Sequence, residues 1–209
     1  MNFFTYLESC GDSANPEAVV EDATVSGLKA SLEEVFPKRL RVARSLIEFV
    51  PKDRARRIVE EGVSLIKTIP GEYNHRKIVD FLLKVFNGLE SRDDFIEFLV
   101  KLGGVDEERA EMIANDQIDK ATMRFLVEKW KGRGCKRVRW IHNGETNPRQ
   151  YHLRRWNGVS GKRNGRPNGL NGYEFDIDKP PVINLKTKER GYPGHMINCH
   201  CSLVPLWDN

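Results

Sequence analysis

The chain has 209 residues, of which 39% are hydrophobic and 31% are charged, and it contains 10 Phe, 4 Trp and 5 Tyr. This apolar content excludes a wholly disordered chain, and no window approaches the roughly 20 uncharged apolar residues of a membrane-spanning helix. We also expect no secretory signal, because the first apolar residues meet Glu8 without a basic flank.

Charge and reactive side chains are distributed unevenly along the chain. Lys and Arg divide 20 to 14 around Gly132 and Asp and Glu divide 24 to 6, so the first part carries −4 and the second part +8. Three of the 4 Cys and four of the 5 His also lie beyond Gly132. We therefore expect recognition or chemistry in the C-terminal part. Without a signal peptide, the cysteines indicate reduced thiols or metal ligands in a protein made in the cytoplasm.

Apolar residues at helical spacing predict an N-terminal part made only of helices, with a break or kink at Pro51 and stops at Pro70, Asn87-Gly88 and Gly103-Gly104. The last helix has Asp106 as its expected N-cap. The expected helices cover residues 17–36, 40–50, 58–69, 78–86, 95–102 and 106–131.

After Gly132 the sequence pattern changes from helical spacing to one typical of strands and loops. Residues 158–172 contain five Gly among Lys and Arg and predict a mobile basic loop. The expected strands cover residues 136–141, 173–177, 182–185 and 197–206. The predicted fold class is α+β, with a helical assembly region over 1–104 and a second domain over 105–209, in which helix 106–131 precedes a small, basic, strand- and loop-rich part over 136–209.

Cys199-His200-Cys201 is the sharpest local feature, because in a strand both thiols would point to one face. Zinc takes four N or S ligands, so two more must come from elsewhere, with His152 and His195 as available imidazoles and Cys135 in reserve. A C-x-C pair is a weaker zinc signal than paired C-x-x-C motifs. Three interpretations stay open: a metal site, a redox-sensitive thiol pair, and thiols buried as small apolar residues.

The segment from Trp140 to His152 contains the turn signals Asn143-Gly144 and Asn147-Pro148. We expect Glu145 and Arg149 to form an ion pair on a tight loop that leads into a short helix. His152 is a candidate general base, metal ligand or hydrogen-bonding core residue, and a His–Cys dyad for nucleophilic catalysis is a further alternative.

Basic residues gather within eighteen positions of the C-terminal part, with Tyr151 and Trp156 among them. Such a run favours contact with nucleic-acid phosphates or with an acidic protein surface, or it forms a solvated loop. No RNP, helix-turn-helix or complete zinc-finger pattern accompanies it. The candidate contact residues are Arg149, Arg154, Arg155, Lys162, Arg163 and Arg166.

A series of motifs from Ala110 to Leu206 resembles the C-terminal domain of the tailed-phage head morphogenesis proteins, the Mu F-like minor head protein family. Ile113–Ala121 is similar to the helix with the family's ARDQ-type motif, except that Asn115 replaces Arg. Trp140, Gly144-Glu145, Arg149 and His152 are similar to its W…GD…R…H segment, with Glu145 in place of Asp. Asn157-Gly158, Pro180-Pro181 and Pro193-Gly194 follow in the family's order, and Asn198-Cys199-His200-Cys201 departs from its N-C-R-C motif only at His200. The motif residues are Asp116, Gln117, Trp140, Glu145, Arg149, His152, Asn198, Cys199 and Cys201.

The resemblance implies a minor structural protein that enters the prohead in few copies, inside the shell near the portal, and is not an enzyme. Its partners would be the portal protein, the scaffold or the major capsid protein, together with packaged DNA bound without sequence preference, and no membrane. It would lie in the virion interior, and in the host cytoplasm during assembly. The alternative is a small zinc-dependent nuclease or toxin-like effector that uses His152 with Cys199 and Cys201.

Overall fold

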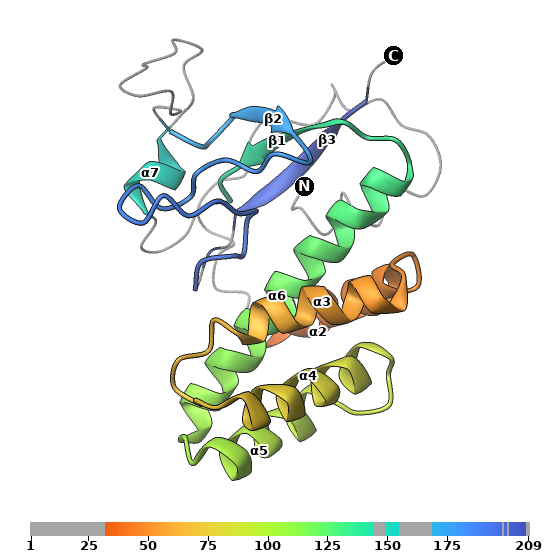
Figure 1. The fold of residues 1–209 in the computed structure, drawn as a ribbon, viewed down its shortest axis with the longest axis vertical. Helices are drawn as coiled ribbons and strands as arrows, with labels where there is room; N and C mark the ends of the chain where they lie inside the picture. The colour runs from red at the N-terminus through yellow and green to blue at the C-terminus, as the bar shows by residue number, and fades with distance from the viewer. Residues whose placement is uncertain (1–31, 144–148, 155–168, 198, 200, 208–209) are drawn as a thin grey trace.

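The computed structural model describes residues 32–143, 149–154, 169–197, 199 and 201–207. The helices in this part of the chain are α2 (Leu32–Ile47), α3 (Lys52–Val63), α4 (Glu72–Phe86), α5 (Arg92–Gly103), α6 (Glu107–Gly132) and α7 (Gln150–Leu153). The strands are β1 (Arg137–Ile141), β2 (Glu174–Asp176) and β3 (Ser202–Leu206). The predicted α+β class is confirmed, with the helical region first and the small sheet after it (Figure 1).

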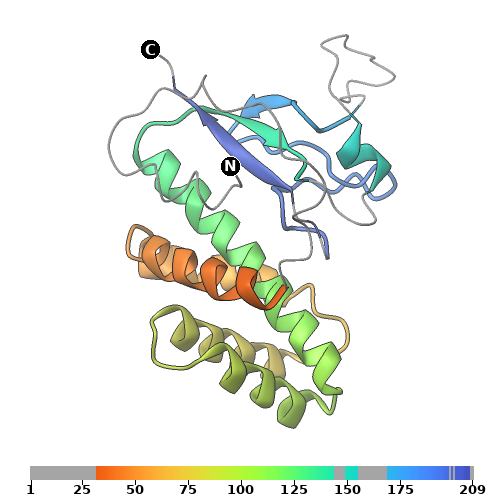
Figure 2. The same cartoon turned by 180° about the vertical axis from the view of Figure 1, so that it is seen from behind.

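Helix α6 connects the two parts of the molecule. It packs against α2, α3 and α5, and it then leads directly into the sheet, as both views show (Figures 1 and 2). Asp106 is its N-cap, since the side chain accepts a hydrogen bond from the backbone N–H of Arg109 at 2.7 Å. The expected division between residues 104 and 105 therefore assigns α6 to the C-terminal part. In the structure, α6 also forms much of the helical bundle.

Two helix boundaries differ from those expected. The helix expected over 17–36 lies mostly outside the described residues, and Phe36 is not a helix end, because α2 continues across Pro37 to Ile47. Burial of Leu40, Ala43 and Leu46 along one face outweighs the loss of one backbone donor at the proline.

Helix α3 ends at Val63, although helical spacing continues to Ile69. Ile66 and Ile69 are buried from a loop, and Nε2 of His75 lies 3.2 and 2.9 Å from their carbonyl oxygens. The apolar spacing is therefore satisfied by a packed loop that the histidine holds in place.

The sheet is antiparallel, with the strand order β2-β1-β3. Val138 and Trp140 of β1 are buried, whereas Arg137 and Arg139 are exposed and pair with Glu174 at 2.5 and 2.7 Å. This alternation of inward and outward side chains is what the sequence predicts for a strand with one face on the core.

Two expected strands are wrong in whole or in part. Residues 182–185 form no strand, because the Asn184 carboxamide accepts hydrogen bonds from the backbone N–H groups of Lys186 and Thr187 and turns the chain, leaving one isolated bridge. The strand expected over 197–206 begins only at Ser202. The two thiols therefore lie in the segment before β3, and the argument from strand alternation does not apply to them.

The described helices include none that combines the length and hydropathy needed to cross a bilayer.

Candidate metal centre

His152, Cys199 and Cys201 lie together beneath the surface. Their ligand atoms are all within 4.8 Å of one another, and their residues are exposed by only 2%, 6% and 5%. Nδ1 of His152 is 3.6 Å from Sγ of Cys199 and 3.9 Å from Sγ of Cys201. Both cysteines carry reduced thiols. One buried imidazole nitrogen therefore faces two buried sulfur atoms contributed from about fifty residues further along the chain.

The orientation of His152 is set by its other ring nitrogen. It projects from α7, and its Nε2 lies 3.2 Å from the carbonyl oxygen of Ile183, which can only accept. A neutral ring that donates from Nε2 leaves the lone pair of Nδ1 directed at the thiols. The Trp140 ring packs edge to face against the imidazole, with centroids 5.4 Å apart, and fixes its plane. A backbone carbonyl on the far nitrogen is the usual arrangement of a metal-binding histidine.

The environment favours the thiolate form of Cys199. A hydrogen bond from Cys201 has the largest influence and lowers the pKa of Cys199 well below the usual thiol range. Burial opposes this change, while the backbone N–H of Gly194 supports it, and the contact with His152 supports it when Nδ1 carries a proton that it donates to the thiolate. Because the thiolate is the species that binds metals, the site presents one ligand close to its binding form. This buried group can hold a metal ion.

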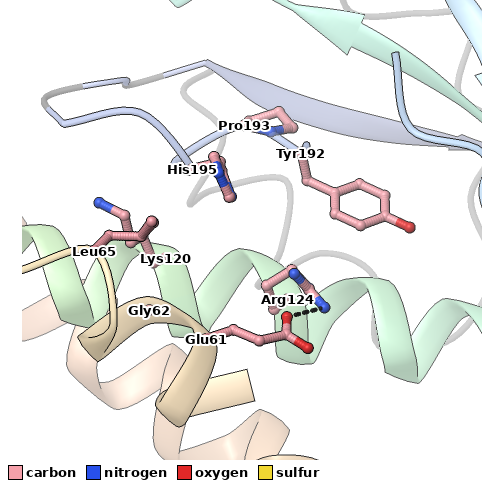
Figure 3. Close-up of a pocket in the computed structure, with 8 residues that line it drawn as sticks. All are labelled: Glu61, Gly62, Leu65, Lys120, Arg124, Tyr192, Pro193 and His195. Atoms are coloured by element: carbon pink, nitrogen blue, oxygen red, sulfur yellow. Dashed lines mark ion pairs between the residues drawn. The ribbon is translucent and has the colours of Figure 1, made fainter. Parts of the chain in front are cut away.

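His195 does not lie with the thiols, contrary to its expected role as a fourth ligand. Its Nε2 is 2.8 Å from a carboxylate oxygen of Glu189, and its ring packs over Gly191, where a Cβ atom would lie 2.9 Å from Cγ of the histidine. Figure 3 shows the ring in a small pocket between α3, α6 and the loop that contains Tyr192. The absence of a Cβ at Gly191 and the carboxylate partner together account for this position.

Cys135, the expected reserve ligand, is also elsewhere. Its thiol donates to the carbonyl oxygen of Arg137 at 3.1 Å, just before β1 begins, whereas Cys201 lies beyond the other end of that strand. A strand of five residues is about 17 Å long, so Cys135 cannot share an ion with Cys201.

His142 is the residue near the thiols that the sequence does not single out. Its Nδ1 is 3.6 Å from Sγ of Cys201, and the side chain is half-buried. It follows β1 directly, just as Cys201 precedes β3, and Ile141 pairs with Ser202 in the last rung of the ladder. The pairing register of β1 with β3 brings His142 and Cys201 together, and only that register could have predicted their proximity.

The earlier motif residues lie where α6 meets α3 and the C-terminal part. Asp116 and Lys120 form a largely buried ion pair one turn apart on α6. Gln117 packs over Gly62 of α3, where a Cβ atom would lie 2.8 Å from the glutamine oxygen. Gly194 lies against the next turn of α6. A Cβ atom on this glycine would be 3.5 Å from the carbonyl oxygen of Asp119. Of these contacts, the one between Gly194 and α6 joins the two parts of the molecule, next to the α6 residues that pack on α3.

The basic candidates are only partly described. Arg149 donates to the carbonyl oxygen of Ile197 at 2.8 Å and so ties the start of α7 to the segment before Cys199, while Arg154 is exposed. Their contact with nucleic acid or an acidic partner stays a prediction. The expected residues and segment outside the described part of the chain are Glu145, Asn198, His200, Arg155, Lys162, Arg163, Arg166 and most of the loop 158–172.

A narrow cavity of about 50 Å³ reaches both thiols from the side of α6. Its wall includes Cys199, Cys201, Asn143 and Gly194, and the Arg39–Asp119 ion pair lies across from them. The volume suits an ion and a few waters rather than a polymer substrate.

Comparison with known proteins gives one distant relative. An uncharacterized protein of Haemophilus influenzae is 24% identical to the chain over 148 residues. The aligned part covers 71% of this chain and 28% of the relative, so the chain spans less than a third of the relative's length. No family model matches the chain, and no solved structure matches it.

Proposed function

We propose that this chain is a minor structural protein of a tailed-phage head, incorporated inside the shell near the portal. We also propose that His152, Cys199 and Cys201 hold zinc as a structural ion. The helical part would contact portal, scaffold or major capsid protein, and the C-terminal part, with its +8 charge, would lie against packaged DNA or an acidic protein surface.

The observation that carries the proposal is the clustering of motif residues that are far apart in the chain. Trp140 and His152 contact each other, and His152 contacts Cys199 and Cys201. These side chains are buried and directed at one another, as expected of residues that maintain a fold. A catalytic role requires access to substrate, whereas both nitrogens of His152 already have partners inside the protein.

The ligand set favours zinc. Thiolate and imidazole ligands together suit Zn²⁺, while Mg²⁺ and Ca²⁺ select oxygen ligands. An ion joining α7 to the segment before β3 would also add stability to the C-terminal part, whose apolar core is smaller than that of the helical bundle.

The assembly role is tested by quantitative mass spectrometry of proheads and filled heads purified from cells that express the phage genes together with this chain. We expect a few copies in each prohead and co-purification with portal protein. Absence from both kinds of particle would contradict the assembly role.

The enzyme alternative is tested with the purified full chain, loaded with zinc and incubated with DNA or RNA. We expect no cleavage. Metal-dependent cleavage that His152→Ala abolishes and His195→Ala preserves would favour the nuclease instead, since only His152 belongs to the candidate centre.

A further inference from the structure

We infer that His142 is the fourth protein ligand of the metal centre, which closes it as a site with two cysteines and two histidines. This inference rests on the zinc centre proposed above and decides what kind of centre it is. Three protein ligands leave one position for water or substrate, as in catalytic zinc sites, whereas four protein ligands make a structural site.

The distances place His142 beside one of the two sulfur ligands. With Zn–S near 2.3 Å and Zn–N near 2.05 Å, a tetrahedral ion places its sulfur and nitrogen ligands about 3.6 Å apart. Nδ1 of His152 is 3.6 Å from Sγ of Cys199, and Nδ1 of His142 is 3.6 Å from Sγ of Cys201. Nδ1 of His152 also lies 3.9 Å from Sγ of Cys201. Each sulfur atom thus has an imidazole at the spacing of two ligands on one ion. His142 lies outside the group whose ligand atoms are all within 4.8 Å of one another, so its ring must turn from Cys201 toward the other two ligands to complete the site.

The sheet fixes the position of His142. Ile141 and Ser202 are Cα partners in the antiparallel pairing of β1 with β3, so His142 and Cys201 lie opposite each other one step beyond the last rung. The backbone N–H of His142 donates to the side-chain oxygen of Asn171 at 3.2 Å, and the Ser202 hydroxyl donates to that of Asn143 at 3.1 Å. These bonds hold the chain on both sides of the ligand.

The exposure of the four side chains suggests an order of binding. His152, Cys199 and Cys201 are buried, whereas His142 is half-buried at the edge of the group. The narrow cavity is lined by both thiols and gives an ion a path to Cys199 and Cys201. The half-buried His142 ring then turns from Cys201 toward that ion and takes the fourth position in place of water.

The experiment compares the full-length wild type with His142→Ala and, as a matched control, His195→Ala, another half-buried histidine of the C-terminal part. Affinity for Zn²⁺ is measured by competition with a chromophoric chelator, and circular dichroism checks folding. Loss of an outer-shell partner typically weakens metal binding by about 10–100-fold, and loss of a direct ligand should cost His142→Ala at least as much. We expect His195→Ala to bind as the wild type does.

Cobalt substitution adds a readout of coordination. The Co²⁺ form of the wild type should show a tetrahedral ligand-field spectrum that exogenous imidazole does not change, whereas imidazole should enter the open position of His142→Ala and restore that spectrum. His142→Cys should retain tetrahedral coordination with stronger sulfur-to-cobalt charge transfer, which keeps the test valid if the alanine variant fails to fold.

Two results overturn the inference in distinguishable ways. Equal Zn²⁺ affinity of wild type and His142→Ala, with no response to imidazole and no added charge transfer in His142→Cys, removes His142 from the centre and leaves the three-ligand zinc site. Folded wild type that binds no Zn²⁺ removes the proposed zinc centre altogether.

Discussion

Helices α2 to α6 bury an apolar core between them, in which Phe86 and Phe125 meet edge to face at 5.4 Å. The described residues after Gly132 are organised differently, since their strands have only 5, 3 and 5 residues and much of the described chain between them is loop. There, a smaller set of buried apolar side chains, including Trp140, Leu170 and Leu203, is joined by contacts between distant segments. The buried His152, Cys199 and Cys201 are the clearest of these contacts. The comparison teaches that a helical bundle can rely on apolar burial alone, whereas a loop-rich part combines a smaller apolar core with specific contacts between distant side chains.

The largest effect is expected from breaking the metal centre. Cys199→Ser should abolish stoichiometric zinc binding and unfold much of residues 133–207, because apparent zinc-binding energies reach about 10–16 kcal/mol in small zinc domains and are folding energy there. Metal analysis and thermal melting followed by circular dichroism check this. Cys135→Ser is the control, since that thiol lies at the other end of β1 and should leave zinc content unchanged.

The next largest effect concerns the helical part. Phe125→Ala should destabilise the bundle by about 3–5 kcal/mol, because the ring is fully buried and its removal leaves a cavity among the packed helices. Urea denaturation followed by helical circular dichroism measures the change. The zinc content of the folded fraction should stay as in the wild type, and parallel loss of zinc under native conditions would contradict the separation of the two parts.

A smaller effect is expected where the two parts touch. Gly194 has φ +80° and rests on α6, so Gly194→Ala should cost about 1–2 kcal/mol through left-handed backbone strain. Gly132→Ala is the matched control, because nothing lies within 4 Å of its Cβ position and alanine favours the helix. Denaturant titration should therefore give changes of opposite sign, and equal destabilisation by both would contradict the assignment.

The smallest effect is expected for the ion pair between Lys131 of α6 and Asp178, at 2.7 Å. A double-mutant cycle with Lys131→Met and Asp178→Asn should give a coupling free energy of about 0.2–1 kcal/mol, since Asp178 is largely exposed and salt screens the pair. A coupling that does not fall when salt is added would argue against a surface ion pair.

The difference between the two parts also explains what the sequence could reveal. Helix α6 was predicted within a residue at each end, because its N-cap, its apolar stripe and its glycine stop are all local. The end of α3 was not predicted correctly, because Ile66 and Ile69 keep helical spacing although they lie in a loop. Local patterns report burial reliably, but a packed loop can satisfy the same pattern.

The candidate centre depended on information that is not local. His152, Cys199 and Cys201 were expected as ligands from their residue types, and the structure brings them together. His195 was expected as an available imidazole, and His142 was not considered as a ligand. The pairing register of β1 with β3 instead places His142 opposite Cys201. Strand register over short segments cannot be read from one sequence.

Hydrogen exchange of the zinc-loaded full chain, with and without a chelator, tests most directly the claim that a metal centre holds the C-terminal part together. Removal of zinc should accelerate exchange in β1, β3 and α7, which the centre joins, and should leave α4 and α5 protected by their apolar core. Unchanged exchange in β1 and β3 after removal of a stoichiometric zinc ion would contradict the claim.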